Sequence, residues 1–199
     1  MQEAPVKVLL VGVDIGEEAD FEYSMEELAS LAEAAEKEVV GQIVQRLDHV
    51  NKALYIGTGK VAEVRRLAEE RGAQEVVFDN SLTPSQVRNL GKELERTVID
   101  RTNLILDIFA IRAQTREAKL QVETARLQYM LPRLVGMYDA LSRQGGASGS
   151  MSNKGTGEKK LELDRRKIEH RITELKKELE YDKTTRADEV SEQIKVARG

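Results

Sequence analysis

Basic side chains and glycines gather in the middle of the 199-residue chain, where they could bind a polyanion. Residues 111–172 carry 13 Lys and Arg against 7 Asp and Glu, whereas residues 1–110 carry 12 against 21. Local positive charge attracts the phosphates of nucleic acids, and glycines let a backbone approach such a surface closely. The alternative is a solvated helix face with ion pairs four residues apart, such as Glu162 with Arg166. The candidate nucleic-acid contacts are Arg112, Arg116, Lys119, Arg143, Gln144, Gly145, Gly146, Lys154, Gly155, Gly157, Lys159, Arg165 and Arg166.

A second candidate anion site is the sequence YIGTGKV at residues 55–61. Gly57, Gly59 and Lys60 stand between an expected strand and an expected helix, where backbone N–H groups can bind a phosphate. The pattern is not a P-loop, because Leu54 replaces the first glycine and Val61 replaces the final Ser or Thr. A tight turn that starts a helix explains these glycines better, and nucleotide binding is kept as an alternative.

The sequence holds no recognisable catalytic or metal-binding pattern. It has no Cys, so it can form neither a disulfide nor a thiolate metal site, and His49 and His170 are isolated from each other. Asp100 and Asp107 could be taken as a carboxylate pair, but their surroundings favour the end of a strand or a turn. We therefore predict no catalytic residue, no metal and no cofactor in this chain.

The first 110 residues alternate between strand and helix patterns, which predicts an α/β fold with a small, mostly parallel sheet flanked by helices. Ser24 and Glu27 suggest a capping box for the first helix, and Gly72 should end the second. Thr83, Pro84 and Gln86 should start the third. The strands are expected at residues 6–13, 39–47, 53–56, 75–79 and 97–100, and the helices at 24–37, 60–71 and 83–96.

The apolar pattern of residues 111–182 predicts a long antiparallel two-helix arm. Leu120, Leu127, Leu134 and Leu141 recur every seven residues, and a second apolar stripe runs from Leu161 to Leu179. Pro132 should kink the first helix. About 28 residues per helix would give an arm roughly 40 Å long, with a glycine-rich tip loop at residues 143–158. Residues 183–199 are polar and are expected to form a loose linker.

The N-terminal apolar run is too short for a signal peptide or a membrane span, and the absence of Cys fits a reducing compartment, so we expect a cytoplasmic protein. Aromatic residues make up only 4% of the chain, which argues against recognition by base stacking. The expected mode of nucleic-acid binding is therefore charge and backbone contact.

Several stretches resemble the N-terminal part of the HflX family of ribosome-associated GTPases. They are YIGTGKV, VVFDNSLTPSQVRNL, the run from Val98 to Leu134, and LSRQGG followed by GTGE and LELDRR. The resemblance implies an α/β domain and a helical arm that precede a GTPase domain, with GTP and Mg expected for the full-length protein. It also implies binding to the large (50S) ribosomal subunit, with the tip reaching its ribosomal RNA in ribosome splitting, rescue or translation regulation.

Two other functions stay open on the residues alone. The first is a nucleotide (ATP)-binding α/β domain that uses the turn from Gly57 to Lys60. The second is a purely structural module in which the leucine stripes of the arm pack against a protein partner. Salt sensitivity separates the second from RNA binding, because phosphate contacts weaken with salt and apolar contacts do not.

Overall fold

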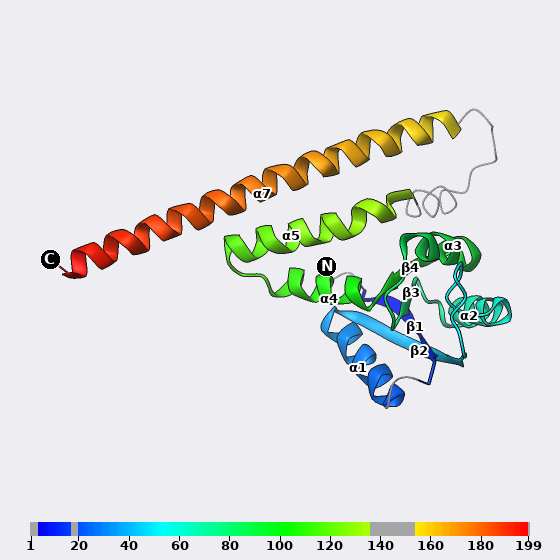
Figure 1. Cartoon of the computed structure of the whole chain (residues 1–199). Coiled ribbons are helices and arrows are strands. Elements are labelled where there is room, and N and C mark those ends of the chain that lie inside the picture. Colours follow the sequence, from blue (N-terminus) through cyan, green and yellow to red (C-terminus); the bar gives the residue numbers. More distant parts are fainter. Residues whose placement is uncertain (1–3, 17–19, 136–153, 199) are drawn as a thin grey trace.

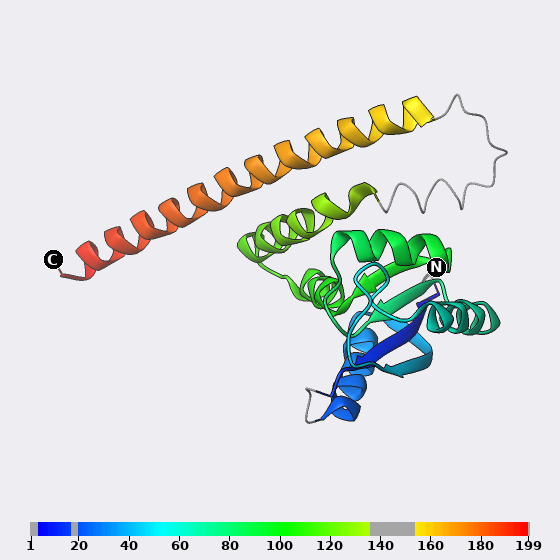
Figure 2. The same ribbon diagram turned by 45° about the vertical axis from the view of Figure 1, so that its right-hand side comes forward.

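The computed structural model describes residues 4–16, 20–135 and 154–198, with the side chains of the last helix described from 159 to 193. The strands are β1 (Val6–Asp14), β2 (Lys37–Arg46), β3 (Glu75–Phe78) and β4 (Thr97–Asp100). The helices are α1 (Phe21–Ala34), α2 (Thr58–Arg71), α3 (Pro84–Leu94), α4 (Arg101–Arg112), α5 (Arg116–Met130), a short 3-10 turn η1 (Leu131–Arg133) and α7 (Lys154–Arg198). Figures 1 and 2 show an α/β domain with α5 and α7 lying along one side of it.

The four strands form one sheet in the order β2-β1-β3-β4, and every pairing is parallel. Successive side chains of β1 face opposite sides of the sheet, and a layer of helices covers each side. Leu9 and Val11 face a core formed with α2 and α3, whereas Val8 and Leu10 face a core formed with α1 and α4. The expected α/β class is therefore confirmed, and the sheet is wholly parallel among the described strands.

The third helix begins as the sequence predicts. The Thr83 side chain accepts from the backbone N–H of Gln86 at 3.2 Å, and the Gln86 side chain accepts from the Thr83 N–H at 2.9 Å. This reciprocal capping box satisfies two N–H groups that the first turn would otherwise leave unpaired. Gly72 ends α2 in the left-handed conformation, as expected.

The capping box predicted at Ser24 and Glu27 is wrong. Helix α1 begins at Phe21, and Asp20 accepts from the backbone N–H of Tyr23 at 3.3 Å as its cap. Ser24 lies inside the helix and donates its hydroxyl to Asp79 at 2.6 Å. Glu27 is used by an ion pair with Arg101 at 3.3 Å. Both side chains are engaged by partners distant in sequence, which local spacing does not reveal.

Three further expectations need correction. Residues 53–56 are not a strand but a turn, closed by a bridge between Asn51 and Tyr55. Helix α4 was not expected, and it packs Leu104 and Ile108 onto the sheet. The chain after residue 182 is not a loose linker, because α7 continues to Arg198. Arg186, beyond the predicted end of the arm, forms an ion pair with Glu117 at 2.7 Å, which helps to hold this extension beside α5.

Candidate functional site

Helices α5 and α7 form the predicted antiparallel arm. Leu120 and Leu134 of the first stripe are buried, as are Ile172 and Leu175 of the second. Ion pairs close the flanks of this seam: Arg171 with Glu123 at 2.9 Å, Arg116 with Asp182 at 3.1 Å and Arg186 with Glu117 at 2.7 Å. The arm is therefore held by apolar contacts along its centre and by charge on both sides.

The backbone stays helical on both sides of Pro132. Met130 ends α5, and Leu131–Arg133 form the single turn η1 with tighter hydrogen bonding. The proline sits near the start of this turn, where its missing N–H costs least. Leu134 then returns to the seam and is buried. Leu141 of the same stripe lies outside the described residues.

The structure separates the predicted basic contacts into paired and unpaired cations. Arg116 bridges to Asp182 and Glu178, while Arg165 and Arg166 pair with Glu169 and Glu162, as the alternative interpretation of a solvated helix face expects. Lys119 and Lys159 are exposed, and neither has a carboxylate partner among the described residues. Arg112 is not on the arm, because it is the last residue of α4.

The remaining predicted contacts fall partly outside the described residues. Arg143, Gln144, Gly145 and Gly146 lie outside the described residues. The first turns of α7 contain Lys154, Gly155 and Gly157, so residues 154–158 are helical rather than part of a loop to residue 158. Along the chain, the basic, glycine-rich stretch stands between η1 and α7, and Figure 1 shows η1 and the start of α7 on the side of the molecule where α3 lies.

The turn from Gly57 to Lys60 starts α2, and its groups already have partners. The backbone N–H of Gly57 donates to the Gln45 side chain at 3.0 Å, and the Lys60 ammonium pairs with Glu63 at 2.7 Å. Gly59 has open space beside its Cα. A phosphate held by the Gly57 N–H and the Lys60 ammonium would have to displace both interactions, which favours a turn that starts a helix.

The arm is joined to the α/β domain by a group of polar side chains that the sequence did not single out. Asp100 ends β4, is fully buried, and accepts from the backbone N–H groups of Leu82 at 2.9 Å and Asn103 at 3.0 Å. Its third donor is the hydroxyl of Tyr129 from α5. Asp100 therefore ends its strand as expected and also binds the arm. The separate expectation for Asp107 is wrong, because this residue lies within α4.

Arg133 strengthens this junction from the end of η1. Its guanidinium lies over the Tyr129 ring, 3.8 Å from the ring centre, and donates to the backbone oxygens of Tyr129 at 3.0 Å and Leu82 at 2.9 Å. Such stacking of a cation on an aromatic face is stabilising and directional. One signal was available in the sequence: Tyr129 and Arg133 stand four residues apart in a helical stretch and can share a face.

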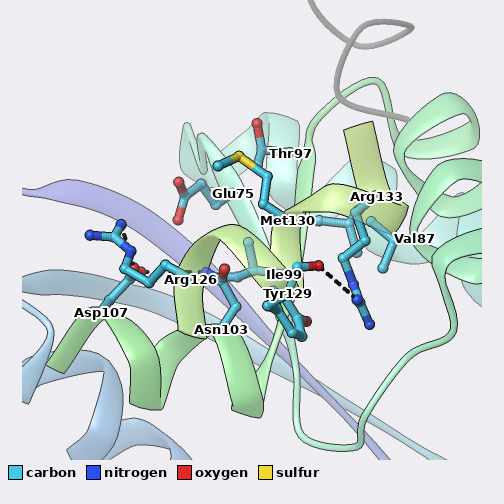
Figure 3. A pocket seen from close by; sticks show the side chains of 11 residues that line it. Glu75, Val87, Thr97, Ile99, Asn103, Asp107, Arg126, Tyr129, Met130 and Arg133 are labelled. Atoms are coloured by element: carbon cyan, nitrogen blue, oxygen red, sulfur yellow. Dashed lines mark hydrogen bonds and ion pairs between the residues drawn. The ribbon is translucent and has the colours of Figure 1, made fainter. Parts of the chain in front are cut away.

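A cavity of about 290 Å³ lies between the edge strand β4, α4 and α5 (Figure 3). At one end Asp107 pairs with Arg126 at 3.1 Å. Burial raises the pKa of Asp107, and the Arg126 charge offsets only part of that effect. Burial also raises the pKa of the Tyr129 hydroxyl, and its hydrogen bond to Asp100 adds to the shift, so Tyr129 remains a hydrogen-bond donor at neutral pH.

Among the described residues, no group of three or more His, Asp or Glu side chains could hold a metal ion. None of the helices searched in the described ranges is long and apolar enough to cross a bilayer. The charged groups of the junction are mostly engaged with one another, so this part of the molecule has the character of an interface between two units rather than of a catalytic centre.

Comparison with known proteins matches two consecutive parts of the chain to family models. A family model described as GTP-binding GTPase N-terminal matches residues 22–110, and one described as GTP-binding GTPase Middle Region matches residues 112–193. A GTPase HflX of Alkalihalophilus pseudofirmus is 51% identical over 174 residues, which is 87% of this chain. The chain belongs to the HflX family. Its similarity extends to the GTPase HflX of Escherichia coli, which is 39% identical over 178 residues.

This chain matches the N-terminal and middle regions of the HflX family and spans only part of its longer members. It covers 40% of the Alkalihalophilus protein and 41% of the Escherichia coli protein. A crystal structure of a GTP-binding protein of Sulfolobus solfataricus with GDP has a TM-score of 0.61 and 26% identity, and it is matched over 90% of this chain and 46% of that one. A structure of SsGBP with GDP gives a TM-score of 0.64.

Proposed function

We propose that this chain is the ribosome-binding N-terminal region of an HflX-like GTP-binding protein, and that its arm contacts ribosomal RNA of the large (50S) subunit. The observation that carries the proposal is a packed two-helix arm whose helices are joined in sequence by a basic, glycine-rich stretch, residues 141–160. The seam between α5 and α7 buries apolar side chains from both helices, which suits a support that must hold its end at a defined distance.

Charge supports RNA as the partner of the end of the arm. The seam ion pairs neutralise the middle of the arm, whereas Lys159 and Lys160 are exposed on the first described side-chain positions of α7. The adjoining stretch adds Arg143 and Lys154 in sequence. The proposed contacts are therefore phosphate and backbone contacts rather than base stacking.

The proposal divides the chain into an α/β domain at residues 1–110 and an arm from residue 111, whose second helix α7 runs from Lys154 to Arg198 and leads toward a GTPase domain in the whole protein. GTP with Mg²⁺ would act in that domain and not in this chain, which has no P-loop sequence. The whole protein would act in the cytoplasm, in ribosome splitting, ribosome rescue or the regulation of translation.

Co-sedimentation with purified large subunits across a salt series tests the proposal. The parent should bind, and its affinity should fall as salt rises, because binding releases counterions from phosphates. Arg143→Ala with Lys154→Ala should weaken binding and flatten the salt dependence. The matched control, Arg65→Ala with Arg66→Ala, removes the same charge from the exposed surface of α2 and should bind as the parent does. Equal binding by both double variants, or no binding by the parent at low salt, would contradict the proposal.

A further inference from the structure

The arm and the α/β domain are held together by polar contacts rather than by a shared core. In the part of the chain that the structure describes, one buried apolar cluster of the domain extends no further along the chain than Val98 of β4, and the other no further than Ile108 of α4. The contacts that reach α5 and η1 are instead the Tyr129 hydroxyl on Asp100, the Arg133 guanidinium on the Leu82 oxygen, and the ion pair of Arg126 with Asp107. A small polar interface of this kind allows the two units to move relative to each other.

We propose that Asp100, Tyr129, Arg133 and the Leu82 carbonyl form a reversible latch that fixes the angle of the arm on the α/β domain. The inference deepens the proposed function and depends on it, since the angle of the arm would decide where the RNA-contacting tip lies. Tyr129 and Arg133 are the positioning residues of the latch. Tyr129 stands at the C-terminal end of α5 and Arg133 in the turn η1 that follows it, whereas the chain connects α5 to α4 at the opposite end, through residues 113–115.

That arrangement makes α5 a lever with its pivot at one end and its latch at the other. The 15 residues of α5 span about 22 Å at about 1.5 Å per residue. The apolar seam and the ion pairs of Arg116, Arg171 and Arg186 join α7 to α5, so the two helices would swing as one body. Residues 113–115 join α4 to α5, and the backbone of Ala113 is extended rather than helical.

Opening the latch leaves the fully buried Asp100 carboxylate with hydrogen-bond partners, which favours a reversible motion. Asp100 keeps its hydrogen bonds to the backbone N–H groups of Leu82 and Asn103 when the Tyr129 hydroxyl departs. Tyr129 and Arg133 are only partly buried and would gain water. Uncompensated buried charge is the usual barrier to parting such an interface, and it does not arise at Asp100. Asp107 would lose Arg126, but it keeps its contact with Asn103 of the same helix at 3.4 Å.

Two features limit the gain from closing the latch. The Arg133 Nε is buried without a hydrogen-bond partner, which costs free energy in the closed state. The cavity of about 290 Å³ lies directly between the edge of the sheet and α5, so part of this interface lacks the close packing of a protein core (Figure 3). The closed state is therefore favoured by few directional contacts, which a single substitution can remove.

Distance measurement between two spin labels tests the latch directly. The chain has no native Cys, so labels can be placed at Arg66→Cys on α2 and Lys167→Cys on α7, both exposed. Double electron–electron resonance should give one main distance for the labelled parent. Tyr129→Phe removes a hydrogen bond to a carboxylate and should raise the open-to-closed ratio about 10- to 100-fold, seen as a second distance or a broad distribution. Adding Arg133→Ala should increase that fraction.

Arg116→Ala is the matched control, because it breaks two ion pairs inside the arm and none at the latch, and it should leave the distance unchanged. A distribution that stays the same in Tyr129→Phe and in the double variant would overturn the latch. Since these distances are measured without ribosomes, they remain informative if large subunits fail to bind the parent. Conversely, normal subunit binding with unchanged distances would reject the latch and leave the proposed function standing.

Discussion

Asp100 is the residue whose removal should cost most at the junction, because one fully buried carboxylate serves both the α/β domain and the arm. Asp100→Ala deprives the buried N–H of Leu82 of its acceptor, which costs about 1–3 kcal/mol. It also removes the cap of α4 at Asn103, which costs about 1 kcal/mol more. We therefore expect the free energy of unfolding to fall by about 2–4 kcal/mol, a large part of the roughly 5–15 kcal/mol of a typical domain.

Urea unfolding followed by circular dichroism measures this change. Asp100→Asn keeps the shape and one carbonyl oxygen, so it should cost less than Asp100→Ala. Asp48→Ala, an exposed carboxylate of a loop, is the control and should lie within about 0.5 kcal/mol of the parent. If Asp100→Ala unfolded at the same urea concentration as Asp48→Ala, the role given to the buried carboxylate would be refuted.

Two further predictions concern the arm and its junction. Leu175 is fully buried in the seam, so Leu175→Ala should lower the free energy of unfolding by about 2–5 kcal/mol in urea, whereas Leu163→Ala, at 56% exposure, should change it little. Because burial and the hydrogen bond to Asp100 raise the pKa of Tyr129, its phenol should ionise well above the ordinary value of about 10 in an absorbance titration. The contribution of this raised pKa to the free energy of unfolding is fully present below about pH 10 and is lost as the pH rises above that value. A Tyr129→Phe protein with the same titration curve, scaled to four tyrosines, would contradict this assignment.

The sequence predicted those elements whose signals are local. The apolar run of β1, the box at Thr83 and Gln86 and the stop at Gly72 depend on neighbours along the chain, and each lies where it was expected. The expectation for Ser24 was wrong because its hydroxyl, which could have capped the helix, instead donates a hydrogen bond to Asp79, 55 residues away. Tertiary contacts decide such cases, and spacing in one sequence does not contain them.

The candidate site shows the same limit. Which cations of the arm are neutralised depends on pairings across the seam, such as Arg116 with Asp182, and these emerge only when α5 and α7 are placed side by side. Helix α4 was missed because its N-cap, Asp100, is also the last residue of β4 and because its apolar residues include three isoleucines, which also suit a strand. The junction of Asp100 with Tyr129 joins residues 29 positions apart on two different elements.

Directed hydroxyl-radical probing tests the central claim most directly. An iron chelate attached at Ala147→Cys, in the glycine-rich stretch, should cleave ribosomal RNA of bound large subunits at a few sites. The same chelate at Arg66→Cys on α2 should cleave elsewhere or not at all. Strong, localised cleavage from position 147 is the result that an RNA-contacting arm predicts. Subunits that bind the protein but are not cleaved from position 147, or are cleaved identically from both positions, would contradict it.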